Sequence, residues 1–256
     1  MNYETLRFER SGEVATITFA RPEKRNAISA CMIDELIAAL DQAEAANSRA
    51  VIITGEGKAF CAGMDLEDLQ RLAQQSPAQN LEDSRRMARM FLRIRAHPQP
   101  VIAAVNGAAA GLGCDMALAC DFILASEQAV FTMSFVKRGL VSDGGGMYFL
   151  PRRVGLPRAK ELMFTGRLVD AKEALAIRLA DRVTSPDMLI ADAVAWAREL
   201  SQASSASIAF SKAILDRTFE STEEQIFALG REAQAVCYTT AEHRDAVTAF
   251  LEKTAR

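Results

Sequence analysis

Two stretches of the sequence could do chemistry through their backbone rather than through their side chains. The first is Phe60–Leu66, which reads FCAGMDL, and the second runs from Val101 to Asp115 and ends in GLGCD. Each passes from an apolar, strand-like segment into small residues that leave the backbone bare, and the second continues into a predicted helix. Backbone N–H groups at such corners polarise a carbonyl oxygen, most strongly at the positive end of a helix. Two converging corners would form an oxyanion hole, as enolate and acyl chemistry require.

Other familiar catalytic patterns are missing from the sequence. The five cysteines are scattered without a CxxC pair and only two histidines are present, so we expect no zinc site. Residues 111–116 begin like a dinucleotide-binding loop but lack its third glycine, and neither a P-loop nor a GxSxG motif occurs. These absences disfavour a nucleotide cofactor and a serine triad. The scattered cysteines are typical of buried, reduced thiols in a cytoplasmic protein.

Length and charge narrow the function classes further. The chain of 256 residues is long enough for one large domain or two modest ones. Its formal charge of −3 argues against binding of nucleic acid through overall electrostatic attraction. The first ten residues are polar and alternating, unlike a signal peptide, and no run of 18 apolar residues occurs. We therefore expect a soluble, cytoplasmic protein that does not enter a membrane.

The elements that must position the two corners alternate between strand and helix. A hairpin is predicted around Ser11-Gly12, and Ser29 can cap the helix that follows. The elements expected in order are strands Tyr3–Glu9 and Val14–Phe19, a helix from Ser29 to Ala46, strand Ala50–Thr54, a helix over 79–96, strand Val101–Val105, a helix over 111–119 and strand Phe122–Ala125. This order predicts a mostly parallel sheet with crossover helices.

The pattern becomes helical after Pro157. Asp170 is expected to cap a helix over Ala171–Leu179, and Pro186 precedes a helix that ends at Leu200. Three further helices are predicted at Ser205–Phe219, Thr222–Cys237 and Thr240–Lys253. Their large apolar side chains, which include Phe210, Phe219, Phe227 and Phe250, must be covered either by another subunit or by the chain's own core.

Taken together, Phe60–Leu66, Pro100–Asp121 and Gly139–Gly146 resemble the enoyl-CoA hydratase/isomerase (crotonase) superfamily. The resemblance extends over nearly the whole chain and includes Arg21–Ala27 near the start and Phe164–Arg167 in the middle. It implies an α/β fold, a spiral of ββα repeats with a C-terminal helical trimerisation region. The corresponding division is residues 1–200 for the core with the active site and 201–256 for oligomerisation. It also implies an acyl-CoA substrate with coenzyme A as part of it, no tightly bound cofactor, and a homotrimer or homohexamer.

The resemblance assigns roles to individual residues. The backbone N–H groups of Met64 and Leu112 correspond to the two oxyanion donors. The other correspondences concern coenzyme A. Lys24 and Arg25 match a segment beside its phosphates, and Ala62 and Asp65 flank the corner where its adenine and pantetheine fold back. Phe250 and Lys253 match residues that reach the coenzyme A of a neighbouring subunit. The alternative for Lys24 and Arg25 is an ordinary solvated loop.

The acidic residues depart from the hydratase pattern. Hydratases of this superfamily commonly have glutamate at the positions of Asp115 and Phe135, so a paired-glutamate water clamp is not available here. Asp143 instead matches an aspartate that acts as base or nucleophile in relatives such as the ring-epoxide isomerase of phenylacetyl-CoA breakdown. The alternatives are a helix N-cap with flexible neighbours for Asp143 and a polar residue of the first helical turn for Asp115. If both line one pocket, burial can raise one pKa enough for proton transfer near neutral pH.

The resulting hypothesis is hydration or double-bond isomerisation of an enoyl-CoA by Asp143, assisted by Asp115. Thioester hydrolysis on the same fold and a coenzyme A-binding protein without activity remain alternatives. RNA binding through the arginines at 85, 89 and 93 is a further alternative, which we do not expect. An apolar acyl pocket is expected from Phe131, Met133, Phe135, Tyr148 and Phe149.

Overall fold

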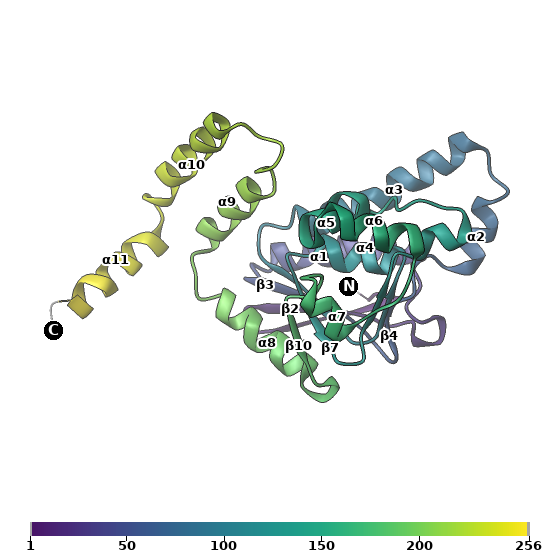
Figure 1. Ribbon diagram of the computed structural model, residues 1–256. Coiled ribbons are helices and arrows are strands. Elements are labelled where there is room, and N and C mark those ends of the chain that lie inside the picture. Colours follow the sequence, from purple (N-terminus) through teal and green to yellow (C-terminus); the bar gives the residue numbers. More distant parts are fainter. Residues whose placement is uncertain (1, 255–256) are drawn as a thin grey trace.

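Three successive strand–strand–helix units form the centre of the fold. The computed structural model describes residues 2–254 and is shown in Figure 1. The first unit consists of β3 (Ala50–Gly55), β4 (Ala59–Cys61), α2 (Leu66–Leu72) and α3 (Pro77–Arg95). The second consists of β5 (Val101–Val105), β6 (Ala108–Ala110) and α4 (Leu112–Ala119). The third consists of β7 (Phe122–Ser126), β8 (Val130–Thr132), the 3₁₀ turn η2 (Ser134–Arg138), α5 (Gly146–Val154) and α6 (Leu156–Thr165). The repetition confirms the predicted spiral of ββα units.

The two strands of each unit enter different sheets. The six-stranded sheet has the order β1-β2-β3-β5-β7-β10, where β1 is Leu6–Ser11, β2 is Val14–Phe19 and β10 is Arg182–Thr184. Only its β1–β2 pair, the predicted hairpin, is antiparallel. The four-stranded sheet has the order β4-β6-β8-β9, with β9 at Val169–Asp170. Because β4, β6 and β8 are parallel, their carboxyl ends meet at one edge of this sheet.

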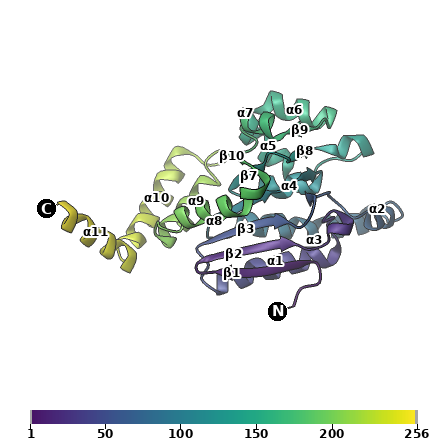
Figure 2. The same ribbon diagram turned by 90° about the horizontal axis from the view of Figure 1, so that it is seen from below.

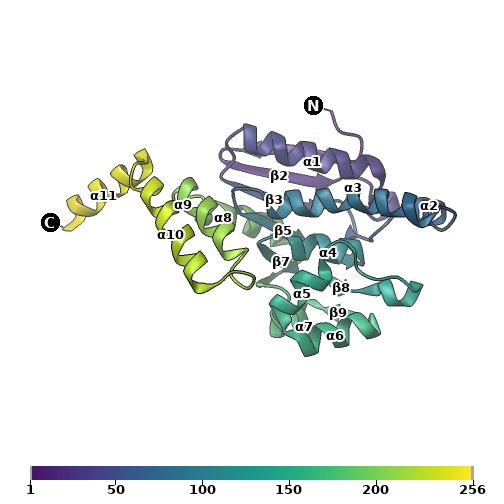
Figure 3. The same cartoon turned by 90° about the horizontal axis from the view of Figure 1, so that it is seen from above.

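Helices cover both faces of the six-stranded sheet, so its central strands β3 and β5 are mostly apolar and almost entirely buried. Figure 3 shows α1 (Ala30–Ala45), α3 and α4 over one face. Figure 2 shows α8 (Leu189–Leu200) over the other, where Trp196 packs beside Ile52 and Ile102. The predicted cap of α1 is confirmed, since the Ser29 side chain accepts a hydrogen bond from the Met32 N–H.

Several predicted helix boundaries shift by a few residues because local bonds decide them. The helix expected over 79–96 begins at Pro77, because Ser76 and Gln79 form a capping box. Asp170 caps α7 (Ala171–Ala176) as predicted, but this helix ends before Leu179 because Arg178 adopts a left-handed conformation with φ of 63°. The helix expected over Ser205–Phe219 ends at Leu215.

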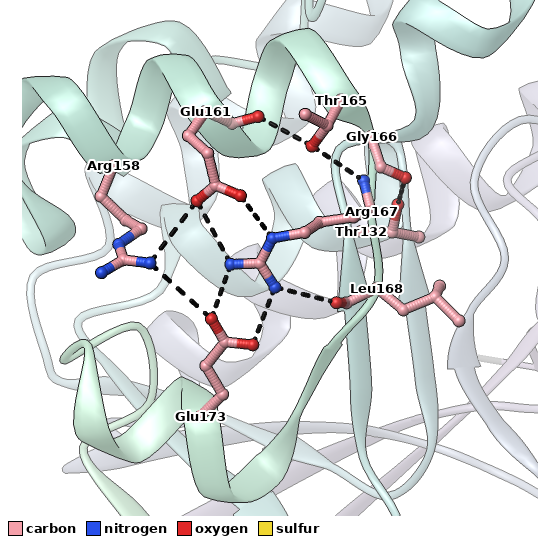
Figure 4. Close-up of polar contacts among 8 residues, drawn as sticks. All are labelled: Thr132, Arg158, Glu161, Thr165, Gly166, Arg167, Leu168 and Glu173. Carbon is pink, nitrogen blue, oxygen red and sulfur yellow. Dashed lines mark hydrogen bonds and ion pairs between the residues drawn. The ribbon is translucent and has the colours of Figure 1, made fainter.

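An ion-pair cluster joins the small sheet to its flanking helices (Figure 4). Arg167 binds Glu173 through two hydrogen bonds of 2.8 and 2.6 Å and also contacts Glu161, while Arg158 lies against both glutamates. A planar guanidinium that holds two carboxylates fixes their directions as well as their distance. Beside it, the Thr132 hydroxyl donates to the Gly166 carbonyl at 3.0 Å. The cluster therefore anchors the end of β8, from which the η2 turn continues.

The last three helices leave the core as an arm. Figures 1, 2 and 3 all show α9 (Ser205–Leu215), α10 (Glu223–Cys237) and α11 (Ala241–Thr254) extending away from the sheets, with α11 at the end opposite α2. Lys212 ties α9 to the core through Asp121 at 2.6 Å. Phe227 and Phe250 on the outer helices are exposed. Among the described helices, none is both long and apolar enough to cross a membrane.

Candidate active site

The two glycine-containing corners touch each other through their backbones. Strands β4 and β6 pair in parallel, with Cys61 opposite Ala109, which brings their carboxyl ends together. A Cβ atom added to Gly63 would lie 2.8 Å from the Ala110 carbonyl oxygen and 3.7 Å from the Leu112 nitrogen. A Cβ atom on Gly113 would lie 2.1 Å from the Cys61 carbonyl oxygen. Glycine is required at 63 and 113 because no side chain fits between the corners.

The backbone N–H groups of Met64 and Leu112 are left without partners. At the first corner, Ile28 bonds to both neighbours of Met64, accepting from the Asp65 N–H and donating to the Gly63 carbonyl. At the second, Gly111 (φ 54°, ψ −120°) turns the chain so that Leu112 is the first residue of α4. The first N–H groups of a helix have no carbonyl within it to bond. Within residues 2–254 neither N–H donates a hydrogen bond, so both are available to a carbonyl oxygen.

Both corners open into one cleft of about 970 Å³. Most of the residues singled out in the sequence line it: Lys24, Arg25, Ala62, Met64, Asp65, Leu112, Phe135 and Asp143. Asp115 does not line the cleft, and neither do Phe250 and Lys253, which belong to α11 of the arm. The structure thus joins the predicted oxyanion donors, one predicted acid and the predicted coenzyme A loop in a single space.

The loop predicted to bind coenzyme A is held in place by a buried asparagine. Asn26 donates to the Ala59 carbonyl at 2.7 Å and accepts from the Arg21 N–H at 3.0 Å. Above it, Lys24 pairs with Glu67 at 2.7 Å, whereas Arg25 makes no ion pair with any described residue. Asn26 was not recognised in the sequence, although its position beside two charged residues in a polar loop was visible. Of the two cations in this loop, Arg25 is therefore the one whose charge is not paired with a carboxylate of the described residues.

Asp65 is buried at the start of α2 and has structural partners. Its carboxylate caps the helix by accepting from the Glu67 N–H at 3.1 Å and pairs with Arg21 at 2.9 Å. Burial opposes ionisation of this carboxyl, but the Glu67 N–H and the Arg21 guanidinium outweigh it and hold the pKa below its usual value. Asp65 therefore fixes the first corner to the coenzyme A loop.

Asp143 stands on the loop that leads into α5, with its carboxylate in the cleft. The N-cap of α5 is Gly145, so the N-cap interpretation of Asp143 is wrong. The side chain keeps an exposed surface, yet the surrounding protein desolvates it and raises its pKa. The Ser84 hydroxyl donates to its carboxylate at 3.1 Å and counteracts this rise.

Ser84 was missed in the sequence, although the helical pattern around it was informative. It shares one face of α3 with Met87 and Phe91, which stand three and seven residues later and are buried. A polar residue on a buried helix face is a signal for a functional contact. Periodicity could not show that the partner would be Asp143, because 59 residues separate the two.

Asp115 lies behind the loop rather than in the cleft. It is fully buried, and its Oδ2 atom accepts hydrogen bonds from the Ser142 hydroxyl at 2.8 Å and from the Gly144 N–H at 3.2 Å. Burial raises its pKa to about 7 and the charge of Asp143 adds to the rise, while the hydroxyl and the backbone N–H groups act against it. This carboxyl is thus bonded to both sequence neighbours of Asp143.

The expected acyl pocket is only partly correct. Of its five residues Phe135 alone lines the cleft, at the position that corresponds by the family resemblance to a glutamate of the hydratases. Phe131, Met133 and Phe149 are buried in the main core, because their strand and helix turn them inward. Other apolar residues face the cleft instead, among them Leu69, Leu72, Leu140 and Val141.

The basic residues of α3 are largely neutralised. Arg85 pairs with Glu82 on its own helix, Arg86 with Asp34, and Arg93 with Asp41 and Glu44 of α1. Ion pairs across two helices are typical of packed, solvated faces rather than of nucleic-acid binding surfaces. Two of the three arginines that motivated the RNA-binding alternative, Arg85 and Arg93, are therefore paired with carboxylates, whereas the exposed Arg89 makes no ion pair with a described residue.

Comparison with known proteins agrees with this geometry. The family model described as enoyl-CoA hydratase/isomerase matches residues 9–256. A short-chain-enoyl-CoA hydratase of Clostridium acetobutylicum is 33% identical over 259 residues, covering 99% of this chain and 97% of its own. A crotonyl-CoA hydratase of Syntrophomonas wolfei is also 33% identical, over 258 residues with the same coverage.

A solved structure shows the same fold. The crystal structure of an enoyl-CoA hydratase/isomerase from Cupriavidus metallidurans superposes with a TM-score of 0.94 at 35% identity, covering 99% of this chain and 95% of the other. Three observations point to the same family: the family model matches most of the chain, the relatives are similar over nearly their full length, and the two backbone corners touch. The chain belongs to the enoyl-CoA hydratase/isomerase family and is an enzyme of that family.

Proposed function

We propose that this enzyme moves protons on an enoyl-CoA thioester, by double-bond isomerisation or by hydration. The observation that carries the proposal is that the free N–H groups of Met64 and Leu112 and the carboxylate of Asp143 line the same cleft. The names of the relatives, which specify short-chain-enoyl-CoA and crotonyl-CoA, support a thioester of this class as the substrate. Coenzyme A enters as part of that substrate.

The two N–H groups would donate hydrogen bonds to the thioester carbonyl oxygen and stabilise the negative charge that develops there as an enolate. This charge stabilisation acidifies the carbon chain next to the thioester. Asp143 would remove a proton from one carbon and return it to another, which shifts the double bond without a net change in atoms. In hydration, the same carboxylate would take a proton from water as the water oxygen bonds to the chain, and would then deliver that proton to the enolate carbon next to the thioester.

Asp143 is the suitable base because its charge is not already engaged. Among the other cleft carboxylates, Asp65 pairs with Arg21, and Asp68 and Asp83 both pair with Arg71. Glu23 also lines the cleft and makes no ion pair with a described residue, but it lies on the exposed loop beside Lys24, away from the Ser84 hydroxyl that bonds Asp143. Asp143 has a hydroxyl as its partner and a raised pKa, which suits proton transfer near neutral pH. With Phe135 opposite in place of a second acid, isomerisation by one base is favoured over hydration by two.

The experiment that tests this proposal is turnover of an acyl-CoA panel with identification of the products. The panel contains 2-enoyl-, 3-enoyl- and dienoyl-CoA thioesters and saturated acyl-CoA, assayed in D₂O. Double-bond migration with deuterium on carbon indicates isomerisation, and a hydroxyacyl product indicates hydration. Release of free coenzyme A from the saturated thioester would instead support the hydrolase alternative, and no turnover of any member would refute the proposal.

Removing the Ser84 hydroxyl should move the acidic limb of the pH profile. In Ser84→Ala the ionised form of Asp143 loses a hydrogen bond, so the pKa of Asp143 rises. A base must be deprotonated, so activity is lost as pH falls through that pKa, and the limb of kcat/KM moves to higher pH. Ser84→Thr keeps the hydroxyl and should restore the profile of the native enzyme. An unchanged limb in Ser84→Ala would show that this bond does not affect the base.

Arg25 should contribute to binding of the nucleotide part of coenzyme A. A charge-assisted contact with a phosphate contributes about 1.5–3 kcal/mol, so Arg25→Ala is expected to raise KM by about tenfold or more with little change in kcat. The matched control is the same acyl group on pantetheine, which lacks the nucleotide phosphates. An equal loss on both thioesters would contradict phosphate binding. Lys24→Ala should have the smaller effect, because Glu67 already engages that amine.

We propose that residues 201–256 form an oligomerisation region and that the active species is a homotrimer or homohexamer. Exposed aromatic side chains on the arm, Phe227 and Phe250, support a subunit interface. Phe250 and Lys253 would then reach the coenzyme A of a neighbouring subunit, since they lie away from the cleft of their own chain. A cytoplasmic location is also proposed, supported by the buried free thiols of Cys61, Cys114 and Cys120.

Light scattering tests the assembly. The native chain is expected at three or six times its monomer mass, and Phe227→Asp with Phe250→Asp should shift it toward monomer because each places a charge in an apolar contact. Leu92→Asp, an equally exposed apolar residue on α3, is the control and should leave the mass unchanged. A native monomer at micromolar concentration would refute the proposal.

A further inference from the structure

The loop that carries Asp143 is wrapped around the buried carboxyl of Asp115. The Oδ2 atom of Asp115 accepts one hydrogen bond from Ser142 and one from Gly144, the residues on either side of Asp143. With 142 and 144 bonded inward to Asp115, the side chain of Asp143 is left on the cleft side.

The glycines that follow Asp143 are explained by the same carboxyl. A Cβ atom on Gly144 would lie 2.8 Å from Asp115 Oδ2 and 2.7 Å from Phe91. A Cβ atom on Gly146 would lie 2.1 Å from Asp115 Oδ1 and 2.7 Å from the Ser142 hydroxyl. A Cβ atom at such separations would force its neighbours to move, so Gly144 and Gly146 provide space for Asp115. Gly145 between them has a different reason, a left-handed φ of +96° and a Phe149 ring 2.5 Å from an added Cβ atom. This corrects the interpretation of Asp143 as having merely flexible neighbours.

The second oxygen of Asp115, Oδ1, is buried and has no hydrogen-bond partner among the described residues, next to the start of α5. The loop enters α5 at Gly146, and backbone N–H groups at the start of a helix favour an acceptor. The titratable groups that face Asp115 are Asp143 from the loop and Cys114 from its own helix, whose thiol pKa is raised by burial and by Asp115. No described cation pairs with the Asp115 carboxyl.

We infer that Asp115 is a positioning residue, whose buried carboxyl clamps Ser142 and Gly144 so that Asp143 projects into the cleft, and that it transfers no proton to substrate. The inference rests on the proposed role of Asp143 as the base. It separates the two aspartates by function: Asp143 contacts the reacting atoms, and Asp115 acts only through the loop. Since Asp115 does not line the cleft, substrate has no route to its oxygens.

A conservative substitution distinguishes positioning from proton transfer. Asparagine keeps a carbonyl oxygen that can accept from Ser142 and Gly144, so Asp115→Asn is expected to retain at least about a tenth of kcat. Asp115→Ala and Ser142→Ala remove the clamp and should each lower kcat by more than Asp115→Asn does. A matched control is Ser201→Ala, which also removes a buried serine hydroxyl with one hydrogen bond, at the C-cap of α8, and should retain full activity.

Amide hydrogen exchange over residues 141–146 provides a readout independent of activity. Exchange should accelerate in Asp115→Ala and Ser142→Ala and stay near the native rate in Asp115→Asn. If Asp115→Ala does not fold, Ser142→Ala and Asp115→Asn still test the clamp.

Two results would overturn the inference. One is a loss of about 10³-fold in kcat in Asp115→Asn with native exchange, which would make Asp115 a proton-transfer group. The other is unchanged exchange in Ser142→Ala. Failure of the native enzyme to turn over any CoA thioester would instead refute the proposed function, and the exchange measurement would still decide whether the clamp exists.

Discussion

Replacing Asp143 with asparagine is expected to reduce kcat by about 10³-fold while the protein keeps its native fold and stability. General acid–base groups contribute about 10²–10⁴-fold to rate, and Asp143 is proposed to be the base for both proton transfers. Asparagine has nearly the same shape and can still accept the Ser84 hydrogen bond, but it cannot take up a proton. KM should change little, because the thioester is held by the Met64 and Leu112 N–H groups and by the coenzyme A loop.

The measurement is steady-state kinetics on the best substrate of the acyl-CoA panel, together with circular dichroism and thermal unfolding. Asp83→Asn is a matched control, since Asp83 also lines the cleft but has its charge engaged by Arg71 at 2.9 Å. It should cost far less than Asp143→Asn. Turnover of Asp143→Asn within tenfold of native would remove Asp143 from the mechanism.

Adding one methyl group at Gly63 is expected to disable the oxyanion hole. The new Cβ atom would lie 2.8 Å from the Ala110 carbonyl oxygen, and alanine is strained at φ of +98°. The two corners must then move apart, so the Met64 and Leu112 N–H groups no longer converge on one oxygen. Removing one such donor costs about 10²–10³-fold in kcat, and we expect Gly63→Ala to lose at least that much.

Backbone strain alone must be separated from the loss of geometry. Gly12→Ala is the control, because Gly12 also has a positive φ, +62°, but nothing lies within 4 Å of an added Cβ atom. Both variants should lose some thermal stability, and only Gly63→Ala should lose kcat. Activity of Gly63→Ala close to that of Gly12→Ala would show that the corners need not touch for catalysis.

The sequence was most informative where a local rule decides the structure. Ser29 and Asp170 cap their helices as predicted, because N-capping depends on residues three positions apart. The corners were identifiable because small residues and glycines follow buried strands, which is a local pattern as well. The family resemblance added the spiral of ββα units, which periodicity alone indicated only as a parallel sheet with crossover helices.

The arrangement of the acids could not be predicted, because it depends on contacts between distant segments. Asp115 and Asp143 were expected to line one pocket, yet Ser142 and Gly144 enclose Asp115 and leave only Asp143 in the cleft. Ser84 reaches Asp143 from a helix 59 residues away in the chain. Phe131 is buried at the middle of β8 and Met133 directly after that strand, and residue type does not reveal which way either side chain faces.

The free N–H groups of the two corners have a consequence for how this active site tolerates change over evolution. The groups that hold the thioester belong to the peptide chain, so almost any residue at 64 or 112 supplies them. The positions that cannot be substituted are instead Gly63 and Gly113. These glycines offer no functional group to substrate, but the facing corner leaves no space there for a Cβ atom. The side chains at 64 and 112 can therefore change, and substrate preference with them, without loss of the N–H groups that stabilise the enolate. That stabilisation depends instead on two glycines that do not contact the substrate.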